Sequence, residues 1–269
     1  MGKAWIIASG KGGVGKSTIA ACLAIGLTRL HQTVCIVDAD VGLRDQDAIL
    51  GLESRVVYDL VDVMNKECTL RQALVVHAAY PGLSLLPASQ FARAKSVDPK
   101  AFRRIIEKLK ASFDHVLIDC PAGIERGLRG VLNTLAEETV VVCMPDDVCI
   151  RDAERACTLL DTMHLPRPWL IVNRLVPELV EAGEMYSAQV VAQTLDLTLL
   201  GEIPEDPIVY RALLKHISPM NTVCEGQKAM TRIARRMAGF TETLPAYGQK
   251  KRSLLGRVFR RRVKEVKII

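Results

Sequence analysis

Long apolar segments are missing from this 269-residue sequence. No stretch approaches the run of about 20 apolar residues that crosses a bilayer as a helix, which excludes a spanning helix. The opening segment, MGKAWIIASG, has a short apolar run that leads into glycines, so we expect a first β-strand there and not a secretory signal. It also lacks the Ser or Thr at the sixth position that a myristoylation signal has.

Paired cysteines and clustered histidines are missing as well. The eight cysteines stand singly, without a C-x-x-C pair, and several lie in apolar runs such as TVCIVDAD. This pattern is typical of reduced thiols in the cytosol and not of a disulfide framework or an iron–sulfur site. The five histidines are scattered and indicate no metal site.

Positive charge is concentrated at the C-terminal end. Of the 36 Lys and Arg residues, nine lie between positions 250 and 267, where only one of the 30 Asp and Glu residues is found. The rest of the chain therefore holds 27 basic and 29 acidic residues and is nearly neutral, although the net charge is +6. We expect any polyanion to bind at this end of the chain.

Short β-rich runs alternate with longer helical ones along most of the sequence. The expected strands are AWIIAS, TVCIVD, LSLLPA, HVLIDC, TVVVCM, PWLIVN and TLLGEI, and the expected helices include 16–30, 99–112, 151–164 and 188–196. This alternation predicts βαβ units, and the Val, Ile and Leu content of the strands predicts burial on both faces. We therefore expect an α/β fold with a doubly wound, mostly parallel sheet flanked by helices, in one domain over 1–245 with a basic tail over 246–269.

The segment GKGGVGKS, residues 10–17, fits the phosphate-binding pattern G-x-x-x-x-G-K-[ST] between a predicted strand and a predicted helix. Its glycines let backbone N–H groups surround phosphates, and the helix that follows adds its positive N-terminal end. Lys16 would neutralise the β- and γ-phosphate oxygens, and the Ser17 hydroxyl would bind Mg²⁺. The predicted nucleotide-binding residues of this segment are Gly10, Lys11, Gly12, Gly13, Val14, Gly15, Lys16, Ser17 and Thr18.

Carboxylates end two other predicted strands. Asp38 and Asp40 follow the strand TVCIVD, and Asp119 ends the strand HVLIDC. Beside a phosphate loop, such carboxylates can hold Mg²⁺ through water or orient an attacking water molecule. Each pattern alone also fits a solvated turn or a buried strand that ends in Asp, so only their combination is specific.

The tail KKRSLLGRVFRRRVKEVKII has apolar residues at helical spacing. Leu254, Leu255, Val258 and Phe259 fall on one predicted face, with basic residues such as Arg257 and Arg260 in the same segment. A basic amphipathic helix of this kind binds anionic membrane surfaces. Nucleic acid is the alternative polyanion, but the apolar face has no role there, so we expect a membrane and no nucleic acid.

The strings KGGVGKST, DADVGLRDQD and DCPAGIE together resemble the deviant-Walker-A (ParA/MinD) ATPases. Within that family, GLRDQD, RVVYDLVDV, LLPASQ, PAGIERG and IPED resemble the branch that positions the division septum, and the similarity runs over most of the chain. The resemblance implies a P-loop ATPase that uses ATP and Mg²⁺ and is activated as a dimer. It also implies a peripheral location on the cytoplasmic face of the cell membrane.

The resemblance also assigns roles to individual residues. It implies that Lys11 reaches the nucleotide of the other subunit in an ATP-bound homodimer, and that Asp40 orients or activates the water. The same resemblance implies that Lys16 binds phosphate and that Asn173 reads the adenine edge. It also implies that the metal is supported by Ser17, Asp38 and Asp119. Three positions depart from the family pattern, namely Ser17 for Thr, Asp45 for Asn and Cys120 for Ser.

These roles combine into one hypothesis. ATP drives dimerisation through Lys11, paired tails hold the dimer on the membrane by avidity, and hydrolysis releases monomers. By resemblance, the dimer recruits a septum inhibitor like MinC and responds to a regulator like MinE or another topological factor. The alternatives are a ParA-type partitioning ATPase, a flagellar-number regulator, an iron–sulfur cluster carrier or nitrogenase-type reductase, and a scaffold with an inactive site.

Overall fold

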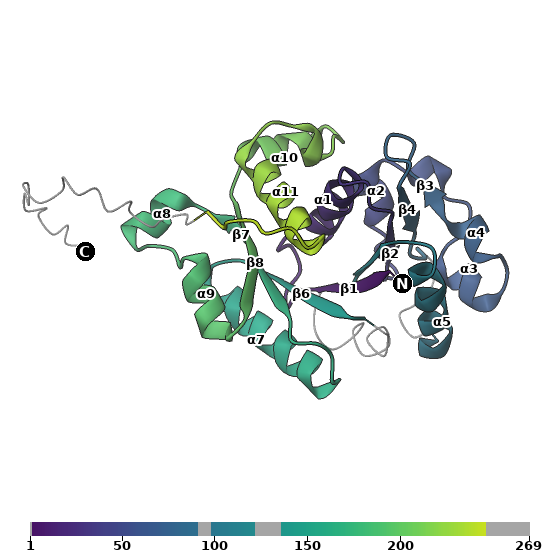
Figure 1. Ribbon diagram of the computed structural model, residues 1–269, viewed down its shortest axis with the longest axis horizontal. Helices are drawn as coiled ribbons and strands as arrows, with labels where there is room; N and C mark the ends of the chain where they lie inside the picture. The colour runs from purple at the N-terminus through teal and green to yellow at the C-terminus, as the bar shows by residue number, and fades with distance from the viewer. Residues whose placement is uncertain (1, 91–97, 122–135, 246–269) are drawn as a thin grey trace, which may run out of the picture.

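A computed structural model of the chain describes residues 2–90, 98–121 and 136–245 (Figure 1). Its centre is an eight-stranded sheet in the order β3-β4-β2-β5-β1-β6-β7-β8. Seven strands pair in parallel: β1 (Lys3–Ala8), β2 (Val34–Asp38), β4 (Leu83–Leu86), β5 (His115–Asp119), β6 (Glu138–Cys143), β7 (Trp169–Leu175) and β8 (Thr198–Pro204). Only the two-residue edge strand β3 (Val75–Val76) is antiparallel. The predicted mostly parallel sheet is confirmed.

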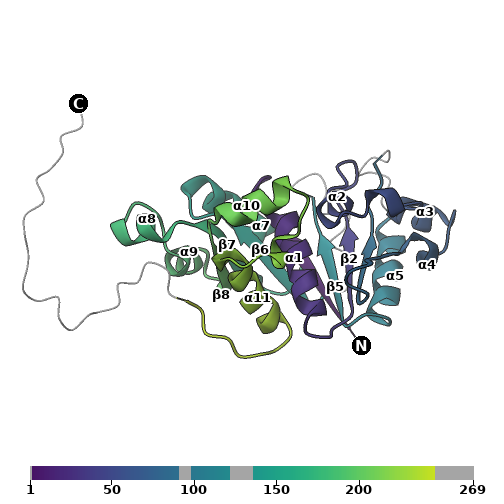
Figure 2. The same ribbon diagram turned by 90° about the horizontal axis from the view of Figure 1, so that it is seen from above.

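Helices cover both faces of the sheet. On one face, α1 (Lys16–Thr28) packs beside α11 (Glu225–Met237), with α10 (Pro207–Leu214) next to them (Figures 1 and 2). On the other face lie α5 (Pro99–Lys110), α7 (Asp147–Thr162) and α9 (Ala188–Leu195). The crossovers through α1 and α7 run in opposite directions along the sheet, and because crossovers are right-handed, their helices lie on opposite faces.

The remaining α-helices of the described residues are short. They are α2 (Gln46–Leu50), α3 (Leu60–Asn65) and α4 (Leu70–Ala73) near the β4 side of the sheet, and α8 (Pro177–Ala182) after β7. Among the described residues, no helix combines the length and the apolar composition that crossing a bilayer requires.

All seven predicted strands are present, and the four predicted helices match α1, α5, α7 and α9. The prediction for α7 began at Arg151, whereas the helix begins at Asp147. The earlier start follows from Asp146, whose side chain accepts a hydrogen bond from the Cys149 backbone N–H at 2.9 Å and caps the helix. The two-residue edge strand β3 was not predicted.

The core lies between the sheet and its helices. Residues from the middle of the strands, such as Ile6, Ile36, Leu117 and Val141, have no exposed surface, which confirms burial on both faces. The predicted tail, 246–269, lies outside the described residues, so its division from the domain over 1–245 stays a prediction.

Candidate nucleotide site

The phosphate loop joins β1 to α1 at the carboxyl edge of the sheet and depends on glycine at two positions. Gly15 immediately precedes α1 with φ 91°, a left-handed conformation that favours glycine. Gly10 approaches α7 closely, because a Cβ atom there would lie 2.1 Å from the carbonyl carbon and oxygen of Asp152. The loop is therefore packed directly against the backbone of α7.

An open cleft of about 440 Å³ lies at this loop and at the start of α1. Its lining includes residues 11–18, Asp40 and Asp45. The N-terminal end of α1 and the loop amides give this wall the positive character that binds phosphate. The structure thus brings most of the predicted loop residues to one cleft.

Lys16 is the buried cation of the site. Its ammonium group forms an ion pair with the carboxylate of Asp119 and donates to Ser17 Oγ at 3.2 Å. The Lys16 and Asp119 side chains are only 6% and 2% exposed, so each charge depends on the other. Three residues predicted from two separate motifs therefore form one connected group.

Asp38 adds a second carboxylate to this group. The parallel pairing of β2 with β5 places Asp38 opposite Asp119. Asp38 Oδ1 accepts from the Asp40 backbone N–H at 3.0 Å, and its Oδ2 accepts from the Gln46 N–H at 3.2 Å. Burial, together with the charge of Asp119, raises the pKa of Asp38 from 3.8 to about 7.

Asp40 lies in the cleft as a half-buried carboxylate. Burial raises its pKa above the ordinary value, and the positive charge of Lys16 opposes this shift. A group with a raised pKa near a phosphate cleft is a candidate for accepting a proton from water. The position of Asp40 thus fits the predicted role in orienting or activating water.

Gln46, the first residue of α2, belongs to this site and was missed by the sequence reading. Its side chain is fully buried, and its Nε2 donates to Ser17 O at 3.0 Å and to Asp119 Oδ2 at 2.7 Å. It stands in the string GLRDQD, which matches no general sequence pattern for a phosphate or metal site. Only the folded structure brings position 46 beside position 119.

The oxygen groups of the site suit Mg²⁺, which prefers hydroxyl, carboxylate and water ligands. No three His, Cys, Asp or Glu side chains gather into a ready-made metal site within the described ranges. Ser17 is therefore the candidate direct ligand, and the carboxylates of Asp38 and Asp119 are placed to act through water. A buried carbonyl oxygen, Gln46 Oε1, has no hydrogen-bond partner among the described residues and adds an acceptor near these groups.

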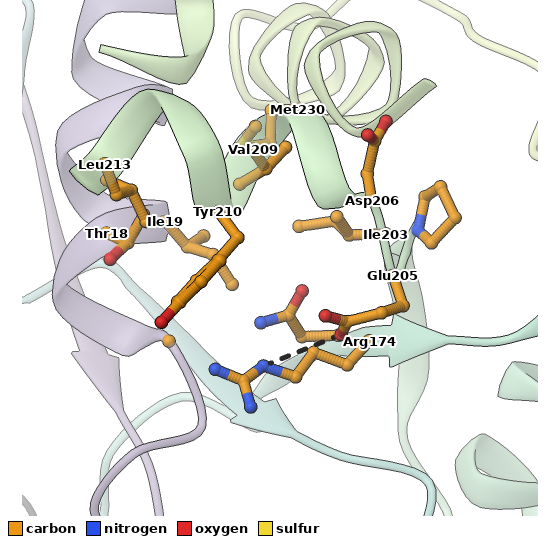
Figure 3. Close-up of a pocket in the computed structure, with 13 residues that line it drawn as sticks. Thr18, Ile19, Arg174, Ile203, Glu205, Asp206, Val209, Tyr210, Leu213 and Met230 are labelled. Carbon is orange, nitrogen blue, oxygen red and sulfur yellow. Dashed lines mark ion pairs between the residues drawn. The ribbon is translucent and has the colours of Figure 1, made fainter. Parts of the chain in front are cut away.

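Asn173 connects the loop to a second pocket. Its Nδ2 donates to Val14 O at 2.8 Å, and the residue lies near the end of β7. The pocket of about 80 Å³ is also lined by Thr18, Arg174 and Tyr210 (Figure 3). In Figure 3, Arg174 and Glu205 form an ion pair at its rim, with Nε and Oε2 3.8 Å apart. The pocket lies beside the phosphate loop and is lined mainly by apolar side chains, which is the environment that a nucleotide base requires, and the role of Asn173 in reading adenine stays a prediction.

Lys11 and Cys120, two positions singled out in the sequence, differ in their exposure to solvent. Lys11 is exposed, and its side chain forms no ion pair with any residue in the described part of the chain. Cys120 is fully buried, and burial raises the pKa of its thiol to about 12, so this thiol is neutral. The predicted membrane residues Leu254, Leu255, Val258, Phe259, Arg257 and Arg260 lie outside the described residues.

Comparisons with known proteins, by family model, by sequence and by structure, agree with one another. A family model described as "ParA: NUBPL iron-transfer P-loop NTPase" matches residues 1–238. The septum site-determining protein MinD of Helicobacter pylori is 45% identical over 241 residues, which cover 87% of this chain and 89% of that protein.

Two solved structures are similar over most of their length. A MinD chain in the MinC:MinD cell division protein complex of Aquifex aeolicus superposes with a TM-score of 0.84 at 34% identity, covering 92% of this chain and 100% of the other. The MinD protein of Pyrococcus horikoshii, solved with Mg-ADP, superposes with a TM-score of 0.77 at 28% identity, covering 88% and 96%.

Proposed function

The chain belongs to the ParA family of P-loop NTPases and, within it, to the septum site-determining MinD proteins, and we propose that it is an ATP-dependent switch that cycles on and off a membrane. It is an ATPase that determines the site of the division septum and uses a nucleotide and Mg²⁺ as cofactors. The observation that carries this proposal is the buried group in which Lys16 contacts both Asp119 and Ser17 beside the glycine loop.

The residues of this group divide the work of phosphate binding. A nucleotide brings phosphate oxygens that compete with Asp119 for the ammonium group of Lys16. Asp119 then becomes available to the metal side of the site together with Ser17 and Asp38, and Mg²⁺, when bound, neutralises phosphate charge. Asp40, in the cleft wall, orients the attacking water or accepts its proton.

Dimerisation is proposed through Lys11. Its side chain is exposed at the cleft and forms no ion pair among the described residues, although its charge acts on the carboxylate of Asp146, so it can bind an anionic group from outside the chain. A phosphate of the partner subunit's nucleotide is such a group. A second cation there stabilises charge that develops during phosphoryl transfer, so ATP binding and assembly are coupled.

Membrane binding is proposed through the basic amphipathic tail. One short helix of this kind binds weakly, whereas a dimer presents two and gains from effective concentration. The tail therefore holds the ATP-bound dimer on the cytoplasmic face of the membrane, and hydrolysis releases monomers. The proposed division of the chain is an ATPase domain over 1–245 and a tail over 246–269.

Partner proteins are proposed from the comparisons. The Aquifex aeolicus protein is similar over 92% of this chain and forms a complex with MinC, which supports a MinC-like septum inhibitor as a partner here. A MinE-like or other topological regulator is proposed from the resemblance of the sequence alone.

The experiment that tests the switch is sedimentation with anionic liposomes in ATP and in ADP. We expect the full chain to pellet with ATP, and we expect both Lys11→Ala and a chain truncated before Lys250 to stay in the supernatant. Lys108→Ala is the matched control, because Lys108 is an exposed lysine on α5, on a helix that does not line the cleft. It should pellet like the unmodified chain.

Three outcomes would contradict the proposal. Equal pelleting of the full chain in ATP and ADP would show that membrane binding by the tail does not depend on the nucleotide. Normal ATP-dependent pelleting of Lys11→Ala would show that membrane binding by the tail does not depend on Lys11. Binding to DNA without binding to liposomes would favour a partitioning ATPase instead.

A further inference from the structure

Gln46 contacts each of the three residues that the proposed metal site requires. Its backbone N–H donates to Asp38 at 3.2 Å, and its side-chain Nε2 donates to Asp119 at 2.7 Å. The same Nε2 donates at 3.0 Å to the carbonyl oxygen of Ser17, the residue whose hydroxyl is the candidate metal ligand. One residue of α2 therefore links β2, β5 and the start of α1.

The chemistry of these contacts fixes the orientation of the Gln46 amide. Both groups that face Nε2 are acceptors, one a carbonyl and one a carboxylate, so the amide nitrogen, and not the amide oxygen, must be the atom in contact with them. Oε1 then remains buried without a hydrogen-bond partner among the described residues. A buried carbonyl oxygen in this state is costly, and a native structure that retains one calls for an explanation.

A purely structural role does not account for this residue. Hydrogen bonding to Ser17 O and Asp119 Oδ2 accounts for the amide nitrogen Nε2, but it does not account for the amide oxygen Oε1, which is buried without a partner among the described residues. The amide is useful if a donor arrives beside Ser17 and Asp119. Water molecules bound to Mg²⁺ are strong donors, because the metal polarises their O–H bonds.

We propose that Gln46 is a positioning residue of the Mg²⁺ site, with Nε2 holding the Asp119 carboxylate in place and Oε1 accepting a hydrogen bond from a water molecule on the metal. This inference rests on the proposed function, since it requires Mg²⁺ and nucleotide to bind at this cleft. Residues that orient metal ligands from outside the first coordination shell change metal affinity by about 10- to 100-fold when they are removed.

The test is a Mg²⁺ titration of ADP binding at equilibrium, followed with a fluorescent ADP analogue, on the full chain. We expect Gln46→Leu to raise the Mg²⁺ midpoint by about tenfold, at the low end of the range for such residues. Gln46→Met is a second apolar variant with an unbranched side chain, which guards against poor packing of Leu. Gln189→Leu on α9 is the matched control, because Gln189 Oε1 is also buried without a partner in the described structure but lies away from the cleft.

Affinity for the ADP analogue in EDTA serves as the check on folding, and it should be similar in all four proteins. If the unmodified chain shows no Mg²⁺-dependent ADP binding, the proposed function itself fails. If it does, and Gln46→Leu and Gln46→Met have its midpoint, the inference about Gln46 is overturned while the proposed function stands. An equal rise of the Mg²⁺ midpoint in Gln189→Leu would also overturn the inference, because the loss of any buried amide would then have the same effect.

Discussion

Removing Asp119 should leave the buried ammonium group of Lys16 without its counter-ion. In the ligand-free protein, the Lys16 and Asp119 side chains are 6% and 2% exposed and form an ion pair. Truncating one partner of a buried pair costs about 3–5 kcal/mol, because the remaining charge is desolvated and uncompensated. Ser17 Oγ remains as an acceptor, and Asp38 loses the repulsion of Asp119. We therefore expect Asp119→Ala to lower the free energy of unfolding by about 3 kcal/mol, at the low end of that range.

Urea denaturation of the ligand-free protein in EDTA measures this loss. Glu107→Ala is the control, because Glu107 pairs with Arg103 at 3.4 Å on the surface, with both side chains at least 41% exposed. An exposed pair of this kind contributes about 0.5 kcal/mol or less. The contrast between the two variants separates the buried pair from the general effect of deleting a carboxylate.

ADP should then rescue Asp119→Ala. In the unmodified protein, the phosphates of Mg²⁺-free ADP must displace Asp119 from Lys16, whereas in the variant Lys16 has no competing carboxylate at that position. The variant should therefore bind ADP in EDTA at least as tightly as the unmodified protein, and its loss of stability should shrink with added ADP. A loss below about 1 kcal/mol, which is the level of an exposed pair, or weaker binding of Mg²⁺-free ADP, would refute this account of Lys16.

Three further predictions concern residues of the phosphate loop and its surroundings. Gly10→Ala should weaken ADP binding by about tenfold or more, because the new Cβ atom would lie 2.1 Å from the Asp152 backbone and would push the loop away from α7. Unchanged affinity in a fluorescence titration would contradict this. Asn173→Ala should reduce the preference for ADP over GDP in competition binding, and a preserved preference would remove Asn173 from base recognition. The metal-free protein should lose up to about 4 kcal/mol of stability as pH rises from about 4 to about 7, because folded Asp38 keeps a proton that the unfolded chain has released. Urea denaturation across this range should show a falling free energy of unfolding. Asp38→Asn should remove this dependence on pH.

Much of the fold and of the site could be predicted because the signals are local. The glycine loop has a fixed spacing, and Asp38 and Asp119 end apolar strands whose carboxyl ends meet at one edge of a parallel sheet. Strand order and register bring these residues together without any further information from the sequence. The ion pair of Lys16 with Asp119 is a direct result of that arrangement.

Other features depend on tertiary contacts and carry no local signal. Gln46 lies in a short helix of five residues, and the partners of its side chain are 29 and 73 positions away in the chain. The start of α7 at Asp147 depends on a cap from Asp146, a residue that also fits a turn. The strand β3 has two residues, and its pairing with β4 defines it more than its composition does.

The register between β2 and β5 has a practical consequence for protein engineering. Asp38 and Asp119 face each other only because the two strands are paired without a slip, and deleting one residue inside either strand would turn its carboxylate to the opposite side of the sheet. Loops at the amino ends of the strands are free of this constraint. The segment 164–167, which precedes β7 at the edge remote from the cleft, is therefore a suitable place to insert a reporter domain in a chain that must still bind nucleotide.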